Sequence, residues 1–352
     1  MDTIKLGLIG CGGMMYNHAC NVNKVEGIEI TVVCDIIPER AEKVAKELGT
    51  NPRMVTDYKQ MVEDVDAVLV ALPHDLHYEC GMSFARHKKH IMMEKPLCNT
   101  EEECLRLIEV CKEEDVTLMC GYPVPFWSSM VELKRLVDTG AFGRIIQMSI
   151  WTEQLTHAPD EWDWSNTARL GGGQFFSHGC HYVDLLLRFL GEPVEGSHFG
   201  TRVGTEWLRR EGTSVAIFKF ANGAIGYHGA TWGARGTRLG YNFQIQTEKG
   251  LLEYDRSANV IRLYGGAGLH VPGDDTSDRY SYTRILWDGN GPASKQTHFE
   301  ISHFIDCIRN HKEPITSGAA ALQSLRIIWK MYEAEKNGTT ADLRGLGLPA
   351  TE

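Results

Sequence analysis

The first candidate for a functional residue in this chain is a lysine that directly follows a short apolar run. Ile91–Met93 predicts a buried strand, and Glu94, Lys95 and Pro96 follow it directly. Pro96 disfavours the helical conformation for Lys95, so the lysine should be extended where the strand leaves the sheet. Ligands of open α/β sheets bind beyond the carboxyl ends of the strands. We therefore expect Lys95 at the mouth of a cleft; a solvated lysine at an ordinary turn is the alternative.

A histidine in the glycine-rich segment 171–184 is the second candidate. His181 and Asp184 are three residues apart in a predicted amphipathic helix, so the carboxylate can orient the imidazole. Histidine suits general acid–base catalysis because its charge changes near neutral pH. A core histidine satisfied by Asp184 is the alternative. His178 and His181 also have a spacing that permits a metal site, but we expect proton transfer and no metal. The three glycines that open the segment should let the backbone approach a ligand.

A glycine loop after the predicted strand Ile4–Ile9 indicates a nucleotide site. Gly10 permits a tight turn, and Gly12 lets the backbone approach a pyrophosphate at a helix N-terminus. Asp35 ends the next strand at the spacing of a carboxylate that binds ribose hydroxyls, which favours NAD over NADP. His77 either faces solvent or, as we expect, borders the nicotinamide. The predicted cofactor-binding residues are Gly10, Cys11, Gly12, Gly13, Met14, Asp35, Leu72, Pro73, His74, His77, Glu94 and Lys95.

Tryptophans interleaved with acidic residues predict a carbohydrate site. Trp151, Trp162 and Trp164 lie within fourteen positions, among several carboxylates. Indole faces stack on the C–H faces of sugars, and carboxylates bind sugar hydroxyls; core packing is the alternative for such tryptophans. The predicted substrate-binding residues are Lys95, Tyr122, Trp151, Glu153, His157, Trp162, Ser177, His178 and His181.

Two α/β domains must position these residues. Strands and helices alternate through residues 1–121, which predicts a Rossmann domain with a doubly wound parallel sheet. Residues 122–352 predict a substrate-binding and oligomerisation domain with a large, open, mostly antiparallel sheet. Asn222-Gly223 marks a hairpin turn there, and Val260–Leu263 reads as an edge strand. One face of this sheet should pack on helices and the other should pair with a second subunit. Residues 265–278 read as a mobile loop, and helices at about 299–310 and 317–336 finish the chain.

Composition narrows the class of partner. The 352 residues carry a formal net charge of −10, which argues against a nucleic-acid or anionic-membrane partner. No apolar run reaches the length of a membrane span, and no secretory leader precedes the first strand. The 10 cysteines contain no CxxC pair, so reduced thiols in a cytoplasmic protein are expected.

These motifs together resemble the glucose–fructose oxidoreductase/inositol dehydrogenase/rhizopine catabolism (Gfo/Idh/MocA) family. The resemblance rests on the Gly10–Gly13 loop, Asp35, Glu94-Lys95-Pro96, the 171–184 segment and Phe299–Arg309. It implies a homodimer or homotetramer and NAD(P)-dependent oxidation or reduction of a sugar, cyclitol or glycoside. By position it makes Lys95 the residue that polarises the reacting hydroxyl and His181 the acid/base.

The chain departs from the family pattern at several positions. Ser177 stands where the family usually has an aspartate four residues before the histidine, and Met15 replaces the last small residue of the glycine loop. His74 replaces an asparagine, and Pro123–Pro125 occupies the place of an arginine. Three functions stay open: an NAD-dependent dehydrogenase, an NAD-recycling enzyme that cleaves a glycoside by oxidation and elimination, and a non-catalytic NAD-binding sugar sensor.

Overall fold

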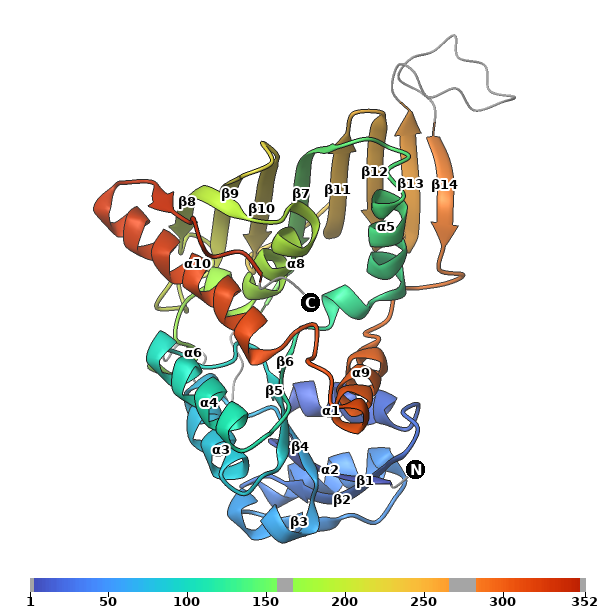
Figure 1. The fold of residues 1–352 in the computed structure, drawn as a ribbon, viewed down its shortest axis with the longest axis vertical. Coiled ribbons are helices and arrows are strands. Elements are labelled where there is room, and N and C mark those ends of the chain that lie inside the picture. The colour runs from blue at the N-terminus through green and yellow to red at the C-terminus, as the bar shows by residue number, and fades with distance from the viewer. Residues whose placement is uncertain (1–2, 157–166, 266–282, 349–352) are drawn as a thin grey trace. The chain divides into compact units, whose positions relative to one another are not determined.

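The chain folds into two units, each with its own β-sheet. The computed structural model describes residues 3–156, 167–265 and 283–348 (Figure 1). The first unit comprises Met1–Pro123, Ala168–Gly171 and Lys295–Leu325, and the second comprises Val124–Thr167, Gly172–Ser294 and Arg326–Glu352. Segments from late in the sequence therefore belong to the first unit. The predicted mobile loop at 265–278 lies almost wholly outside the described residues.

The sheet of the first unit is parallel and has six strands, which confirms the predicted Rossmann fold. Its order is β3-β2-β1-β4-β5-β6, so the strand order reverses between β1 and β4. Ligands of such sheets bind at this reversal, beyond the carboxyl ends of the strands. The strands are β1 (Ile4–Ile9), β2 (Ile28–Cys34), β3 (Arg53–Val55), β4 (Ala67–Val70), β5 (His90–Glu94) and β6 (Leu118–Gly121).

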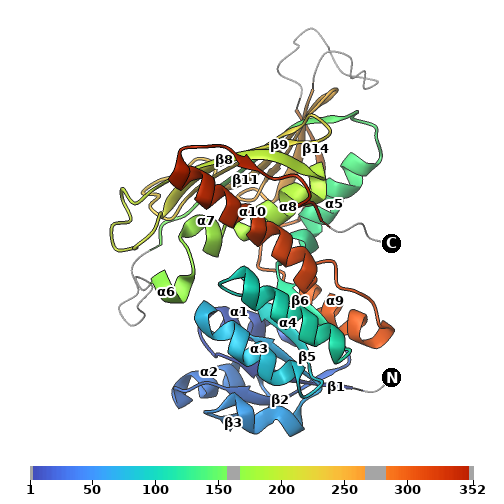
Figure 2. The same cartoon turned by 60° about the vertical axis from the view of Figure 1, so that its left-hand side comes forward.

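Helices cover both faces of this sheet (Figures 1 and 2). Helices α1 (Gly13–Val22) and α2 (Pro38–Leu48) pack together on one face, with α9 (Thr297–Asn310) beside α1. Helices α3 (His77–Ala85) and α4 (Glu101–Glu113) pack together on the other. Each presents an apolar stripe to the sheet: α2, for example, buries Ala41, Val44 and Leu48.

The sheet of the second unit has nine strands in the order β14-β13-β12-β11-β7-β10-β9-β8-β15. Its strands pair antiparallel except for β7 with β10, which confirms a mostly antiparallel sheet. The prediction of an edge strand at Val260–Leu263 is wrong, because β14 pairs with β13 along that side. The strands are β7 (Ile145–Glu153), β8 (Pro193–Thr201), β9 (Thr213–Phe220), β10 (Ile225–Thr231), β11 (Tyr241–Thr247), β12 (Gly250–Asp255), β13 (Val260–Gly265), β14 (Thr283–Asp288) and β15 (Ala341–Asp342).

The two faces of the nine-stranded sheet differ. The described helices of this unit lie on one face (Figures 1 and 2). They are α5 (Ser128–Asp138), α7 (Gln174–Ser177), α8 (Cys180–Leu190) and the 326–337 part of α10 (Gly318–Asn337). Buried Met148, Ile150 and Phe243 meet them. The other face exposes Phe199, Ile217 and Ile225 at 69%, 44% and 47% of their surface. Because side chains alternate between faces, each strand residue has a definite side.

The capping box of α4 offers a test of the first unit. The Thr100 hydroxyl accepts a hydrogen bond from the Glu103 N–H at 3.2 Å. Thr100→Ala should lower the free energy of unfolding by about 1 kcal/mol, because that N–H loses its partner. Urea denaturation measures the change, with Thr3→Ala at an exposed site outside any helix or strand as the control. Equal stability of the two variants would show that the cap contributes nothing.

Candidate functional site

The glycine loop at the carboxyl end of β1 has the geometry of a pyrophosphate site. Gly10 has φ +82°, and a Cβ there would lie 2.6 Å from the Ala71 carbonyl oxygen, so only glycine fits. A Cβ added at Gly12 or Gly13 would meet nothing within 4 Å. No side chain caps the N-terminus of α1, so its first N–H groups are left for an anion. Cys11 belongs to the same loop, and Met14 lies in the first turn of α1. These residues fit the phosphates of a dinucleotide.

Asp35 closes this loop onto the end of β2. Its Oδ2 accepts a hydrogen bond from the Cys11 N–H at 2.7 Å, and its Oδ1 accepts one from the Ile37 N–H at 2.9 Å. Ile36 beside it is 82% exposed, an unusual place for a large apolar side chain. A carboxylate oxygen has a further lone pair after one such bond. Asp35 therefore anchors the loop and retains acceptors for ribose hydroxyls.

Lys95 directly follows β5, at the same carboxyl edge of the sheet, and is half-buried. Glu94 before it is buried, and its carboxylate bonds to His18 Nε2 at 2.7 Å and accepts from the Lys95 N–H at 3.2 Å. Burial by itself raises the pKa of Glu94, but the hydrogen bond and charge of His18, with the charge of Lys95, outweigh burial and leave it lowered. The prediction that Glu94 binds the cofactor is therefore corrected: its carboxylate points inward and holds the backbone of Lys95.

A third ionisable group, Glu300 of α9, is buried beside this pair. Ligand atoms of His18, Glu94 and Glu300 lie within 4.8 Å of one another, and within the described residues they form the only group close enough to share a metal ion. Neither oxygen of Glu300 has a hydrogen-bond partner in that part of the chain. Burial, with the charge of Glu94, raises the pKa of Glu300 well above its usual range. Burial therefore favours the neutral, protonated form of Glu300.

Two histidines follow β4, and they differ in role. His77 is fully buried, with Nδ1 2.8 Å from the Pro96 carbonyl oxygen and Nε2 2.9 Å from that of Leu72. His77 is therefore not solvent-facing but buried between the loop after β4 and the loop after β5, where a neutral imidazole donates to one of the two carbonyl oxygens; its place beside the cofactor stays a prediction. His74 is half-buried, and burial and the charge of Lys95 lower its pKa well below the usual range. A neutral His74 close to Lys95 stays a candidate cofactor contact, together with Leu72 and Pro73.

The glycine–histidine segment of the second unit forms two short helices, α7 and α8, where a single helix was predicted. The break falls at His178 and Gly179. A Cβ added at Gly173 would overlap the Glu211 carboxylate, and one at Gly172 would overlap Phe176. The expectation that these glycines admit a ligand is therefore corrected, because they admit neighbouring side chains.

His181 lies at the start of α8, almost fully buried, with its ring centroid 5.7 Å from that of His178. Asp184 does not orient it. Both carboxylate oxygens of Asp184 accept from Arg188, at 2.6 and 3.0 Å, because an i, i+4 arginine reaches the same helix face. The expected His181–Asp184 pair is therefore wrong as an orienting contact and as a core contact. Ser177 is 1% exposed.

Several side chains around His178 had no signal in the sequence. Its Nε2 lies 3.3 Å from the Tyr241 hydroxyl, which donates a short hydrogen bond to Gln154 Oε1. Gln174 Nε2 lies 3.4 Å from His178 Nδ1. Tyr241, Gln154 and His178 come from distant parts of the chain, so only the pairing of β11 with β7 brings them together.

Several predicted substrate residues lie elsewhere. Thr152 faces the helices, where its Oγ1 lies 3.1 Å from buried His228 Nε2; its neighbours Trp151 and Glu153 therefore point to the opposite face of the sheet from His178. Tyr122 is fully buried, with its hydroxyl 3.1 Å from Ser324 Oγ. Placing these three at the substrate site is thus corrected. His157, Trp162 and Trp164 lie outside the described residues.

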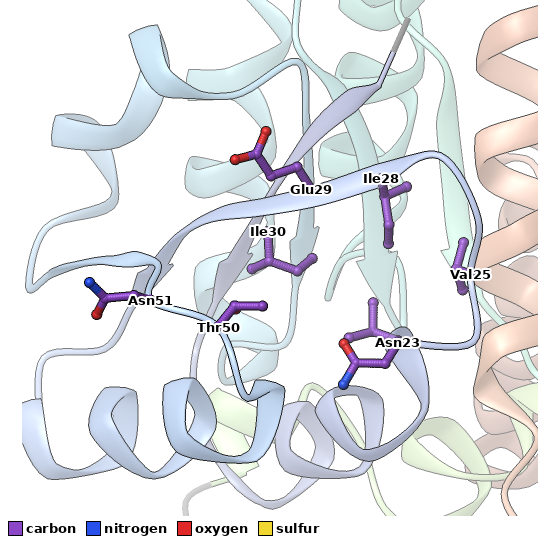
Figure 3. Close-up of a pocket in the computed structure, with 8 residues that line it drawn as sticks. Asn23, Val25, Ile28, Glu29, Ile30, Thr50 and Asn51 are labelled. Carbon is purple, nitrogen blue, oxygen red and sulfur yellow. The ribbon is translucent and has the colours of Figure 1, made fainter. Parts of the chain in front are cut away.

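A surface pocket of about 320 Å³ lies at the other end of β2 (Figure 3). Val25, Ile28 and Thr50 help to line it, with the amide side chains of Asn23 and Asn51. Ile28 opens β2, whereas Asp35 follows its last residue. The pocket is therefore at the amino edge of the sheet, away from the glycine loop and Lys95, and is not the cofactor site.

The comparisons with known proteins all indicate the same family. Residues 4–122 match the family model of an oxidoreductase family with an NAD-binding Rossmann fold, GFO_IDH_MocA, and residues 130–253 match the GFO/IDH/MocA C-terminal domain. The chain is 30% identical over 285 residues to 2,7-anhydro-N-acetylneuraminate hydratase of Escherichia coli, covering 78% of this chain and 74% of that protein.

Two further relatives agree with this. Myo-inositol 2-dehydrogenase of Thermotoga maritima is 29% identical over 345 residues, 95% of this chain and 96% of its own. A solved complex of levoglucosan dehydrogenase with NADH and levoglucosan superposes with a TM-score of 0.85 at 21% identity, over 97% of this chain and 100% of that one, and so shares the fold. In the described part of the chain, no helix has the length and apolarity of a membrane span.

The raised pKa of Glu300 predicts a pH-dependent stability. Its pKa is raised in the folded chain, so folded protein binds more protons than unfolded protein above the unfolded pKa, and stability falls as pH rises from there. Glu300→Gln removes this loss. Relative to wild type, the variant should gain about 1 kcal/mol or more of unfolding free energy between pH 5 and pH 8.

Denaturant melts at both pH values measure this, with exposed Glu313→Gln as the matched control. If the two variants respond to pH alike, Glu300 is ionised in the folded chain.

Proposed function

Because the chain belongs to the Gfo/Idh/MocA oxidoreductase family, with its NAD-binding Rossmann fold, we propose that it oxidises a secondary hydroxyl of a sugar, glycoside or cyclitol to a ketone. The observation that carries the proposal is Lys95, held at the carboxyl edge of the parallel sheet by inward-facing Glu94. The named relatives act on an inositol and on sugars by their printed names, which supports this substrate class.

NAD is the cofactor that the first unit fits. The loop Gly10–Gly13 and the uncapped N-terminus of α1 would hold the pyrophosphate, and Asp35 would bind the ribose. Bound NAD supplies a hydride acceptor at its nicotinamide ring. The residues of the chain then have to bind the alcohol, orient it and accept its proton.

Lys95 belongs to the first unit and His181 to the second, and we take their joint role on one hydroxyl from the family resemblance. The Lys95 ammonium donates a hydrogen bond to the hydroxyl oxygen and stabilises the negative charge that develops there. His181 accepts the hydroxyl proton as the oxygen–hydrogen bond breaks, and the carbon loses its hydride as the C=O bond forms. Ser177 cannot supply the carboxylate that the family usually places there, so we assign its relay position to His178, which is in ring contact with His181.

A second candidate keeps NAD bound and recycles it. One relative is named a hydratase, and a hydration has no net oxidation, although the family binds a redox cofactor. Oxidation at one carbon acidifies the neighbouring C–H, which permits loss of a leaving group; the hydride then returns to the product. This chemistry would cleave a glycoside without accumulating NADH.

The open face of the nine-stranded sheet is our proposed subunit interface. Phe199, Ile217 and Ile225 expose large apolar surface on adjacent strands β8, β9 and β10 of that face. Exposed apolar patches of this kind mark protein contacts. We propose a homodimer or homotetramer built through it.

Product analysis separates the two candidates. Purified protein with excess NAD is offered inositols, free hexoses and alkyl or aryl glycosides, while NADH absorbance and released aglycone are both followed. NADH in equal amount to a ketone product supports the dehydrogenase. Aglycone without NADH supports the recycling enzyme. If neither NADH nor aglycone is formed while NAD is still bound, the result would favour a non-catalytic sugar sensor.

Substitutions at the two proposed catalytic residues test the mechanism. Lys95→Ala and His181→Ala should each reduce kcat by about 100-fold or more, because each group acts in the transition state. NAD affinity should stay close to wild type, measured by fluorescence titration. Exposed Lys46→Ala and His87→Ala are the controls. Near wild-type turnover in either active-site variant contradicts its assignment.

Asp35 is tested through cofactor preference. Asp35→Asn keeps an acceptor for one backbone N–H and removes the charge; Asp35→Ala removes both. Both should weaken NAD binding, by about tenfold for alanine, and narrow its advantage over NADP, because the carboxylate no longer repels the 2′-phosphate. Titration of each variant with NAD and NADP measures this. Unchanged affinities would remove Asp35 from the ribose site.

A further inference from the structure

An arginine of the second unit is held against two aromatic rings without an acidic partner. The Arg256 guanidinium carbon lies 5.0 Å from the Trp127 ring centroid and 5.3 Å from that of Tyr241. Among the residues that the structure describes, no carboxylate forms an ion pair with it, although the side chain is half-buried. Its neighbour Asp255 is paired with Arg262 instead, at 2.9 Å. The N–H groups of Arg256 are thus donors without an anionic acceptor.

Arg256 stands at the end of a continuous series of side chains that leads to His181. Its backbone N–H donates to the Tyr241 carbonyl oxygen at 3.2 Å. The Tyr241 hydroxyl lies 3.3 Å from His178 Nε2, and the His178 ring is in edge contact with His181. All four side chains belong to the second unit and to the helix-covered face of its sheet. Arg256 is therefore in the same polar cluster as the proposed acid/base.

Trp127 provides a second donor at this place. Its side chain is buried at 8% exposure, and its indole N–H has no acceptor in the described residues. Buried donors are nearly always paired, so an unpaired one indicates a missing partner. The Arg256 guanidinium lies over the ring that carries this unpaired N–H, so both donors belong to one place where an anionic acceptor would suit them.

We propose that Arg256 and Trp127 form a subsite for a carboxylate group of the substrate, so that the preferred substrate is an acidic sugar. This rests on the proposed function and specifies its substrate. The planar guanidinium matches a carboxylate with two parallel hydrogen bonds, and the two rings hold it in place. One guanidinium neutralises one carboxylate, whereas a phosphate dianion needs further cations. Hydroxyls of the same sugar would be bound by Tyr241, Gln154 and His178.

Matched acid and neutral sugars test the subsite by binding. NADH-loaded protein is titrated calorimetrically with three matched pairs of an acid and a neutral sugar. The pairs are D-glucuronate and D-glucose, D-galacturonate and D-galactose, and N-acetylneuraminate and its methyl ester. Glucose 6-phosphate is titrated separately. The acid of at least one pair should bind about tenfold or more tightly than its neutral partner. Arg256→Gln should abolish that ratio and Arg256→Lys should reduce it. Arg284→Gln, at an exposed residue of β14, should preserve it.

NADH affinity and melting temperature of each variant report correct folding. An acid preference that survives Arg256→Gln, or its absence in every pair, overturns the subsite. An Arg256-dependent preference for glucose 6-phosphate overturns the carboxylate and assigns the site to phosphate. If neutral cyclitols or glycosides are oxidised but no acid in any pair binds more tightly than its neutral partner, the subsite is refuted and the proposed dehydrogenase is not.

Discussion

The hydrogen bond between His18 and Glu94 is the interaction on which the first unit depends. It joins α1, which begins at the glycine loop, to the end of β5, which carries Lys95. Both side chains are almost without solvent contact, so the loss of either would leave a buried polar group unpaired. The same carboxylate also accepts the Lys95 N–H. One buried pair therefore sets the spacing between the proposed phosphate-binding loop and the proposed catalytic lysine.

Neighbouring groups extend this constraint. Glu300 packs against the pair from α9, a late segment of the chain that belongs to the first unit. His77 joins the loops after β4 and β5 through two carbonyl oxygens, close to the same lysine. The carboxyl edge of the sheet is thus braced by buried polar side chains, and Asp35, Lys95 and the glycine loop lie at that same edge. A braced edge suits a cofactor site, because the groups that bind the cofactor must keep their positions.

In the second unit the constraint is the alternation of side chains along nine strands. Thr152, Tyr241 and Arg256 share the face that packs on helices, and His178 and His181 come from those helices. Trp151 has the opposite orientation, with its ring 5.5 Å from Tyr227 on the open face. Two adjacent residues of one strand can therefore belong to different features, one to the polar cluster and the next to the face of the proposed subunit interface.

The sequence by itself determined the fold class, the alternation of the first third and the places where chemistry begins. Short apolar runs, the glycine loop, the Thr100–Glu103 cap and the Asn222-Gly223 turn are local signals, so they could be read without coordinates. Tertiary structure decided which side chains meet. Glu94 points inward and Trp151 faces away, because these outcomes depend on burial and on strand register; the Asp184–Arg188 pair, in contrast, is a local i, i+4 contact of α8 that the sequence spacing already permitted. Gln154 follows β7 and is far in the chain from Tyr241 of β11, and only the pairing of these two strands brings them together.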